Sequence, residues 1–343
     1  MSNIFNDLNP ENMNKSKSLL SKVLGFIKNI NKEEKESDIL IDISKYHELS
    51  YTEAKKENIP IENLFLEYIK LNSQSETFEI ASFPGIVMEL NKAVSDPNST
   101  FTVFSDIIKK DPSLTLKILK LANSPLYKKN NDVVNLQDAI GLIGLKATKN
   151  LILSAVLKAS VFNTAYSKKI AANLWKDAIL TAIIAENFAK LQQLNESFLY
   201  TLALLHNIGG TVALNQADKF QKEKKIVLSE NELVIRIVKK FQPPMTKTIL
   251  KKWGFKDLYI EAVLSQDKEK DEKDNVLFKI LYFSQTVSKS LLSGELKKMD
   301  KMGLSIFYEE LLKKAKLKIF PRTARIIMNE SLQEFQQVSK LIS

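Results

Sequence analysis

The sequence contains no cysteine and only two histidines, His47 and His206, among 343 residues. Without cysteine the protein cannot form disulfides, thiolate metal ligands or a cysteine nucleophile, and this composition is typical of a reducing compartment. No apolar run reaches the roughly 20 residues of a transmembrane helix, and the N-terminus lacks the basic and then apolar pattern of a secretory signal. We therefore expect a cytoplasmic protein with no transmembrane segment.

Charge is distributed unevenly along the chain. Residues 1–80 carry 14 acidic and 10 basic side chains, a net charge of −4, whereas the whole chain has a formal net charge of +10, which leaves +14 for residues 81–343. The two parts are expected to attract each other. Because the lysines of the second part are spread over many predicted helix faces, they are more typical of a solvated surface than of a nucleic-acid site.

Residues 1–76 are predicted to form a helical interaction module with a flexible start. Apolar side chains recur every three or four residues between residues 16 and 30, which indicates an amphipathic helix that docks on the protein, self-associates or lies on a membrane. Residues 39–72 predict two short helices joined at Ile59-Pro60. The second of these is acidic, unlike a DNA-recognition helix, and His47 is expected on the exposed surface.

A series of helix signals begins at residue 83. Asp111 is a suitable N-cap with Pro112 at the first helical position, and the helix that follows is expected to end at residues 123–125. A short helix is expected from residue 135 to a break at Gly144, and a long one from about 147 to 162. Further along, a charged helix over 221–242 is predicted to end at Pro243-Pro244.

Several ordered blocks of the sequence resemble the HDOD family, the HD-related output domains of bacterial signalling proteins. The blocks are FPGIVMELNKAVSDP, KKDPSLTLKILKLANSPLY, LQDAIGLIGLKATKNLIL, LWKDAILTAIIAENFA, ALLHNIGG, LKKWGF and LFKILYFSQTVSKSL, which together span roughly residues 78–292. The resemblance implies an all-α domain related to the HD phosphohydrolases, in two packed halves. It also implies a regulatory or scaffolding role, generally without the full metal site.

An active HD site needs several imidazoles and carboxylates that converge on one or two divalent cations. Here the His-Asp doublet is replaced by His206-Asn207, Asp177 stands near the place of an earlier family histidine, and Ser265-Gln266 stand where later histidines often occur. We therefore interpret His206, Asn207 and Asp177 as the remnant of a site, with no catalytic residue, metal or cofactor. His206 is expected to be a buried side chain with both ring nitrogens hydrogen-bonded. A residual metal-dependent phosphohydrolase remains the alternative.

The chain becomes basic after Gly294. If any part of the chain contacts a polyanion, the prediction assigns this contact to the basic residues of this stretch, namely Lys313, Lys314, Lys316, Lys318, Arg322 and Arg325. No aromatic stacking platform or RNA motif accompanies them, so binding to nucleic acid or an anionic surface is a second alternative.

The sequence thus predicts an all-α protein with three parts. Residues 1–76 form the N-terminal module, residues 77–292 the HDOD-like domain with halves 77–165 and 166–292, and residues 293–343 basic helices that pack on that domain. The predicted function is non-catalytic regulation in bacterial signal transduction. The predicted partner is an unidentified signalling protein or a small signalling ligand, and self-association is compatible with the amphipathic N-terminal helix.

Overall fold

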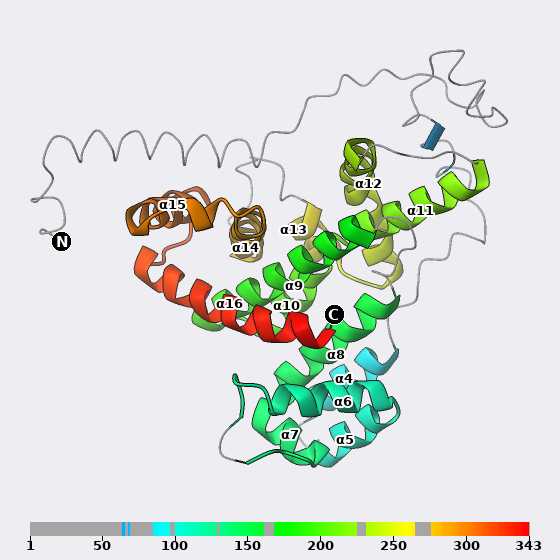
Figure 1. Ribbon diagram of the computed structural model, residues 1–343, viewed down its shortest axis with the longest axis vertical. Helices are drawn as coiled ribbons and strands as arrows, with labels where there is room; N and C mark the ends of the chain where they lie inside the picture. The colour runs from blue at the N-terminus through cyan, green and yellow to red at the C-terminus, as the bar shows by residue number, and fades with distance from the viewer. Residues whose placement is uncertain are drawn as a thin grey trace, which may run out of the picture.

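The computed structural model describes residues 64, 65, 68, 85–96, 100–128, 131–160, 168–224, 231–264 and 276–342. Within these ranges all regular structure is helical, which confirms the predicted all-α class (Figure 1). The predicted helix at 16–30, His47 and Ser265-Gln266 lie outside the described residues. Apart from residues 64, 65 and 68, which are helical, the part of the chain that can be compared with the predictions begins within the first family-like block.

The described residues of the first half of the domain form five helices. They are α4 (Gly85–Ser95), α5 (Phe101–Lys109), α6 (Pro112–Ala122), α7 (Leu136–Ile143) and α8 (Leu145–Ser160). The predicted caps are confirmed, because Asp111 accepts from the Ser113 N–H at the start of α6 and Asn135 accepts from the Gln137 N–H at the start of α7. Gly144 has a φ of 90°, which permits the chain to turn between α7 and α8 at a bend of 105°. Helix α8 begins slightly earlier than predicted.

The second half is built around the long helix α9. Its helices are α9 (Lys168–Leu191), α10 (Glu196–Leu204), α11 (Ile208–Lys224), α12 (Asn231–Lys252), α13 (Asp257–Leu264) and α14 (Val276–Leu292). Helix α9 packs against α10 and α14, and α11 pairs closely with α12.

The helix predicted over 221–242 is wrong at both ends. Helix α11 continues to Lys224, and α12 runs through Pro243 and Pro244 as far as Lys252. A proline inside a helix costs about 3 kcal/mol because it removes a backbone donor and crowds the preceding turn. Beyond the two prolines, α12 buries four more side chains, Met245, Thr246, Ile249 and Leu250, and this tertiary packing overrides the local preference.

Two further helices complete the described chain. After a short 3₁₀ helix, Leu296–Lys298, the chain forms α15 (Lys301–Lys314) and α16 (Pro321–Ile342). Helix α16 packs against α9 in the second half and against α6 and α8 in the first, so it spans both halves (Figure 1). It therefore holds the two halves together from one side.

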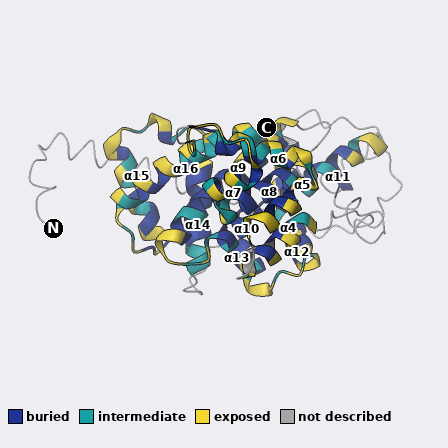
Figure 2. Ribbon diagram, turned by 90° about the horizontal axis from the view of Figure 1, so that it is seen from below, coloured by how far each residue is buried: buried dark blue, intermediate teal, exposed yellow. Residues whose placement is uncertain are grey.

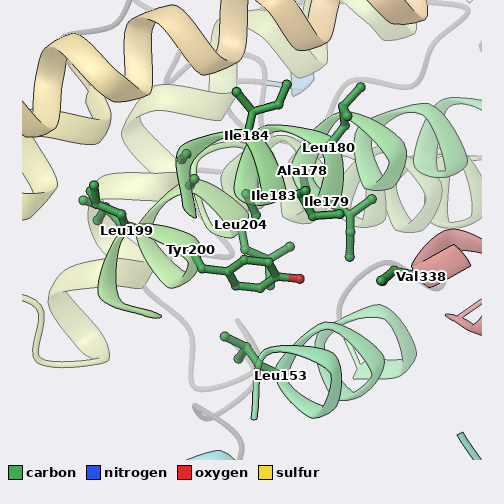
Figure 3. Close-up of a cluster of buried hydrophobic side chains, with 14 of the residues drawn as sticks. Leu153, Ala178, Ile179, Leu180, Ile183, Ile184, Leu199, Tyr200, Leu204 and Val338 are labelled. Atoms are coloured by element: carbon green, nitrogen blue, oxygen red, sulfur yellow. The ribbon is translucent and has the colours of Figure 1, made fainter. Parts of the chain in front are cut away.

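The main core lies where α8, α9, α10 and α16 converge. Buried residues occupy the centre of the molecule and exposed ones its rim (Figure 2). Figure 3 shows side chains from four helices meeting at this point, with Leu153 of α8, Ile183 of α9, Tyr200 of α10 and Val338 of α16 among them. All four are buried. The two halves thus share one hydrophobic core.

A second apolar cluster lies on the α11–α12 pair and includes three residues of the N-terminal region. Phe65 is fully buried, and its ring lies 5.4 Å from that of Phe220 and 5.2 Å from that of Phe241. Tyr68 packs on Phe220 at 5.2 Å, and Leu64 is also buried. The described side chains of the N-terminal region therefore bind the second half through aromatic packing.

One helical stretch in the described chain, Glu196–Glu223, is long and apolar enough to cross a membrane, and the bent pair α7–α8 would be a second if it formed one span. Of the apolar 18-residue segment within this stretch, 89% is buried inside the protein. Its apolar side chains belong to the α10 and α11 packing described above.

Candidate functional site

His206 and Asp177, which the sequence suggested as parts of one site, lie next to each other. His206 occupies the turn between α10 and α11, and its Nε2 is 3.2 Å from Asp177 Oδ2 on α9. Its Nδ1 is 2.7 Å from the Ala203 carbonyl oxygen. The Ala203 carbonyl and the Asp177 carboxylate are both acceptors, so each ring nitrogen of His206 lies within hydrogen-bonding distance of an acceptor in the protein. The His206 side chain is only 2% exposed.

Asp177 is held by a third element as well. Its Oδ1 accepts a hydrogen bond of 2.7 Å from the Ser288 hydroxyl on α14. Burial acts to raise the pKa of this carboxyl, but the His206 hydrogen bond and charge, with smaller contributions from Lys289 and Ser288, outweigh it and lower the pKa below its usual value. Asp177 is therefore ionised, and it ties α9, α14 and the α10–α11 turn together.

Asn207, the next residue, is held by the backbone of α9. Its Nδ2 donates a hydrogen bond of 2.9 Å to the Leu174 carbonyl on α9, and the residue is 1% exposed. Its Oδ1 is buried and has no hydrogen-bond partner in the described chain. The Asn207 amide thus joins the α10–α11 turn to the backbone of α9.

Two glycines follow this pair, and Gly209 has a definite structural role. Its N–H donates to Thr246 Oγ1 on α12 at 3.1 Å, and a Cβ at this position would lie 2.2 Å from the Gln242 carbonyl oxygen. Only glycine lets α11 approach the backbone of α12 so closely. The helix that begins at the His206-Asn207 turn is therefore fixed against α12 as well as α9.

The described residues do not form a recognisable metal site. Among them, no group of three or more histidine, cysteine, aspartate or glutamate side chains is placed so that it could hold a metal ion. His206 and Asp177 are a pair, and a metal ligand would have to be a neutral imidazole with one nitrogen free of protons. In the observed arrangement both nitrogens are used for hydrogen bonds within the protein.

A second polar cluster lies inside the junction of the two halves. The Glu186 carboxylate on α9 accepts a hydrogen bond of 2.7 Å from Asn150 on α8. Asn150 also accepts one from Ser197 on α10 at 3.3 Å, and Ser154 on α8 pairs with the Tyr200 hydroxyl at 2.7 Å. These bonds connect α8, α9 and α10 across the junction of the halves.

Several ionisable groups in this junction have perturbed pKa values, and those of Glu186, Glu334 and Lys149 move toward neutral pH. Burial, with repulsion from Glu334 and Glu196, raises the pKa of Glu186 to about 8, and burial raises that of Glu334 on α16 to about 7. Burial lowers the pKa of Lys149 to about 8, against the attraction of Glu186. Near neutral pH the cluster therefore exchanges protons, and its charge depends on pH within this range.

The six basic residues suggested for polyanion contact lie elsewhere. Lys313 and Lys314 end α15, Lys316 and Lys318 lie in the following turn, and Arg322 and Arg325 belong to the first turns of α16; all six are exposed. Neither α15 nor α16 supplies a residue to the His206–Asp177 pair.

Sequence reasoning missed Ser288 and the Glu186 cluster. The sequence held a signal for Ser288, because five small or neutral polar residues lie among the apolar residues of α14 and all five are buried, namely Ser284, Gln285, Thr286, Ser288 and Ser290. Such residues on a buried face need partners inside the protein. The signal for Glu186 was weaker. A single acidic residue near the end of an apolar helix such as α9 is typical of a helix end exposed to solvent.

The described chain is thus an all-helical fold in which a buried histidine–aspartate pair joins α9, α14 and the α10–α11 turn. The HDOD domain family matches residues 80–269, which is more than half of the chain. The chain therefore belongs to the HDOD family, as the ordered sequence blocks predicted.

Solved structures share the fold at low sequence identity. An HDOD domain protein of unknown function from Geobacter sulfurreducens aligns with a TM-score of 0.57 and 18% identity, covering 82% of this chain and 99% of its own. A candidate metal-dependent phosphohydrolase from Shewanella amazonensis SB2B aligns with a TM-score of 0.59 and 20% identity, and the alignment covers 82% of this chain and 98% of that protein. A candidate signal transduction protein from Marinobacter aquaeolei VT8 aligns with a TM-score of 0.54 and 17% identity, and the alignment covers 88% of this chain and 67% of that protein.

A curated relative is an uncharacterized protein of Treponema pallidum (strain Nichols), which is 27% identical over 136 residues. The match covers 39% of this chain and 26% of that protein, so the chain spans about a quarter of its relative. This similarity extends to part of the chain only.

Proposed function

We propose that the protein is a non-catalytic regulatory module of bacterial signal transduction that acts through contacts with a partner protein. The observation that carries the proposal is the closed hydrogen bonding of His206, whose two ring nitrogens bind Ala203 and Asp177. An HD phosphohydrolase would use such an imidazole to hold a cation. Here the hydrogen-bonded His206–Asp177 pair instead joins the α10–α11 turn to α9 and, through Ser288, to α14, which is a structural role.

A regulatory role fits the family to which the chain belongs. Regulation through protein contacts requires a stable surface, and the His206–Asp177 pair stabilises the place where α9, α14 and the α10–α11 turn meet. A small signalling ligand as the regulating partner, and a cytoplasmic location, are further parts of the proposal. Fractionation of the native cell would test the location.

The test of the proposal uses a partner identified by crosslinking and purification from the native cell. Its affinity for the purified wild-type chain is then compared with that for His206→Gln and Asp177→Asn, each checked for folding by thermal melting. We expect the fraction of partner bound by each variant to follow the fraction of that variant that is folded. Adding a metal chelator should not change the binding. The proposal fails if the chain hydrolyses nucleotides or cyclic dinucleotides in a metal-dependent reaction that His206→Gln abolishes while the fold survives.

A further inference from the structure

The turn between α15 and α16 carries an exposed aromatic side chain in a strongly basic surrounding. Phe320 is 76% exposed, although a large apolar side chain in water is unfavourable by about 25 cal/mol for each Å². It directly precedes Pro321, the first residue of α16. Residues 311–329 contain six basic side chains and no acidic one. We call Phe320 and these six cations the α15–α16 tip.

The exposure of Phe320 is imposed by the residues on either side of it. Leu317 is 8% exposed and Ala324 is fully buried, and Ile319 packs against the main core. The Leu317 N–H donates to the Leu312 carbonyl at 2.9 Å, which closes the end of α15. With both flanks anchored in the core, the Phe320 ring is directed to the solvent.

The basic side chains of the tip share one surface with a second apolar residue. Arg322, Arg325 and Ile326 follow the three- and four-residue spacing of one helix face, and all three are exposed, Ile326 by 49%. Lys316 and Lys318 precede Phe320 in the turn and are also exposed. The nearest acidic residues in sequence are Glu310 and Glu330, which lie outside the stretch.

We propose that the α15–α16 tip binds the surface of an anionic lipid bilayer, with Phe320 inserted among the lipids and the surrounding lysines and arginines at the headgroups. Charge complementarity selects an anionic partner, because each basic residue near such a surface strengthens binding about fivefold. A nucleic acid would also attract the charge. However, an isolated phenylalanine accompanied by an exposed isoleucine suits hydrocarbon better than a stack of bases, which calls for several aromatic rings along a groove.

This inference is independent of the proposed regulatory function, and co-sedimentation of the full chain with lipid vesicles tests it. We expect binding to vesicles of phosphatidylcholine with phosphatidylglycerol, little binding to phosphatidylcholine alone, and a loss of binding with added salt. Arg322→Gln with Arg325→Gln should lower the partition coefficient roughly twentyfold. Phe320→Ala should lower it about tenfold through lost apolar burial.

The matched control is Lys109→Gln with Lys110→Gln, which removes the same charge from two exposed residues at the C-terminal end of α5, far from the α15–α16 tip in Figure 1. It should leave binding nearly unchanged. A Phe320→Trp variant should show a blue-shifted emission on vesicles. The proposal is overturned if anionic vesicles do not bind, if the control weakens binding as much as the arginine pair, or if Phe320→Ala has no effect. Binding to DNA but not to vesicles would also overturn it, and would assign the tip to nucleic acid.

Discussion

Replacing Gly209 by alanine tests whether the turn after His206 is fixed by the close approach of α11 and α12. The new Cβ would lie 2.2 Å from the Gln242 carbonyl oxygen and 2.4 Å from the Thr246 nitrogen, both atoms of the α12 backbone. Ordinary contacts begin at 3.4 Å, so the two helices must separate by about 1.2 Å. Backbone atoms cannot rotate away as the end of a side chain can.

The magnitude follows from three contributions. Overpacking of this kind costs about 1–3 kcal/mol or more, and loss of the Gly209–Thr246 hydrogen bond costs about another 1 kcal/mol. The better helix propensity of alanine returns up to about 1 kcal/mol. We therefore expect Gly209→Ala to lower the free energy of unfolding by about 1–4 kcal/mol, and the Tm by about 1–6 °C for a chain of 343 residues.

Gly210→Ala is the matched control. Its added Cβ would meet only Gln242 Oε1 at 3.1 Å and Val238 Cγ1 at 3.2 Å, which are the ends of side chains that can move. Urea unfolding followed by circular dichroism should show a change within about 1 kcal/mol for this variant. If Gly209→Ala proves as stable as Gly210→Ala, the close approach does not constrain the turn and the argument is refuted.

Other predictions concern the ionisable groups and the aromatic contact. In the folded protein Glu186 and Glu334 hold protons that the unfolded chain has released, so the free energy of unfolding should fall as pH rises from about 5 to about 8. Urea unfolding at a series of pH values should show a flatter slope for Glu186→Gln with Glu334→Gln. A flat profile for the wild type would contradict the buried cluster. The pH dependence that Asp177 contributes has the opposite sign, because the pKa of Asp177 is lowered in the folded protein. Its contribution to the free energy of unfolding is present above the ordinary carboxyl pKa and is lost on acidification. Asp177→Asn should therefore destabilise the protein by about 3 kcal/mol at neutral pH and remove this loss of stability at low pH. A double-mutant cycle between Phe65 and Phe241 should give a coupling of about 0.5–1.5 kcal/mol, whereas simple additivity would mean that the two rings do not pack together in solution.

Local signals in the sequence predicted much of the first half of the domain. Asp111 with Pro112, and Asn135, mark helix starts because a side-chain cap or a proline at the first position acts within one turn of chain. Gly144 marks the break between α7 and α8 for an equally local reason. Signals of this range do not depend on the tertiary structure, so they carry over to the fold.

The signals that failed depend on contacts between distant segments. Pro243-Pro244 predicted a helix end, yet the packing of Thr246 and Ile249 continues α12 through both prolines. Ser288 became part of the site only through its contact with Asp177, which lies 111 residues earlier in the chain. The proximity of His206 and Asp177 could be suggested from the family pattern, but the hydrogen bonds that use both ring nitrogens required the folded geometry.

The claim that His206 and Asp177 form a structural pair is tested most directly by metal analysis of the purified chain. The protein would be incubated with manganese, iron, zinc or magnesium, passed over a desalting column and measured by mass spectrometry, alongside folded His206→Gln. We predict metal far below one equivalent in both proteins. One equivalent of metal bound by the wild type and lost in His206→Gln would contradict the account. The His206 imidazole would then bind a cation and would not be hydrogen-bonded to Asp177.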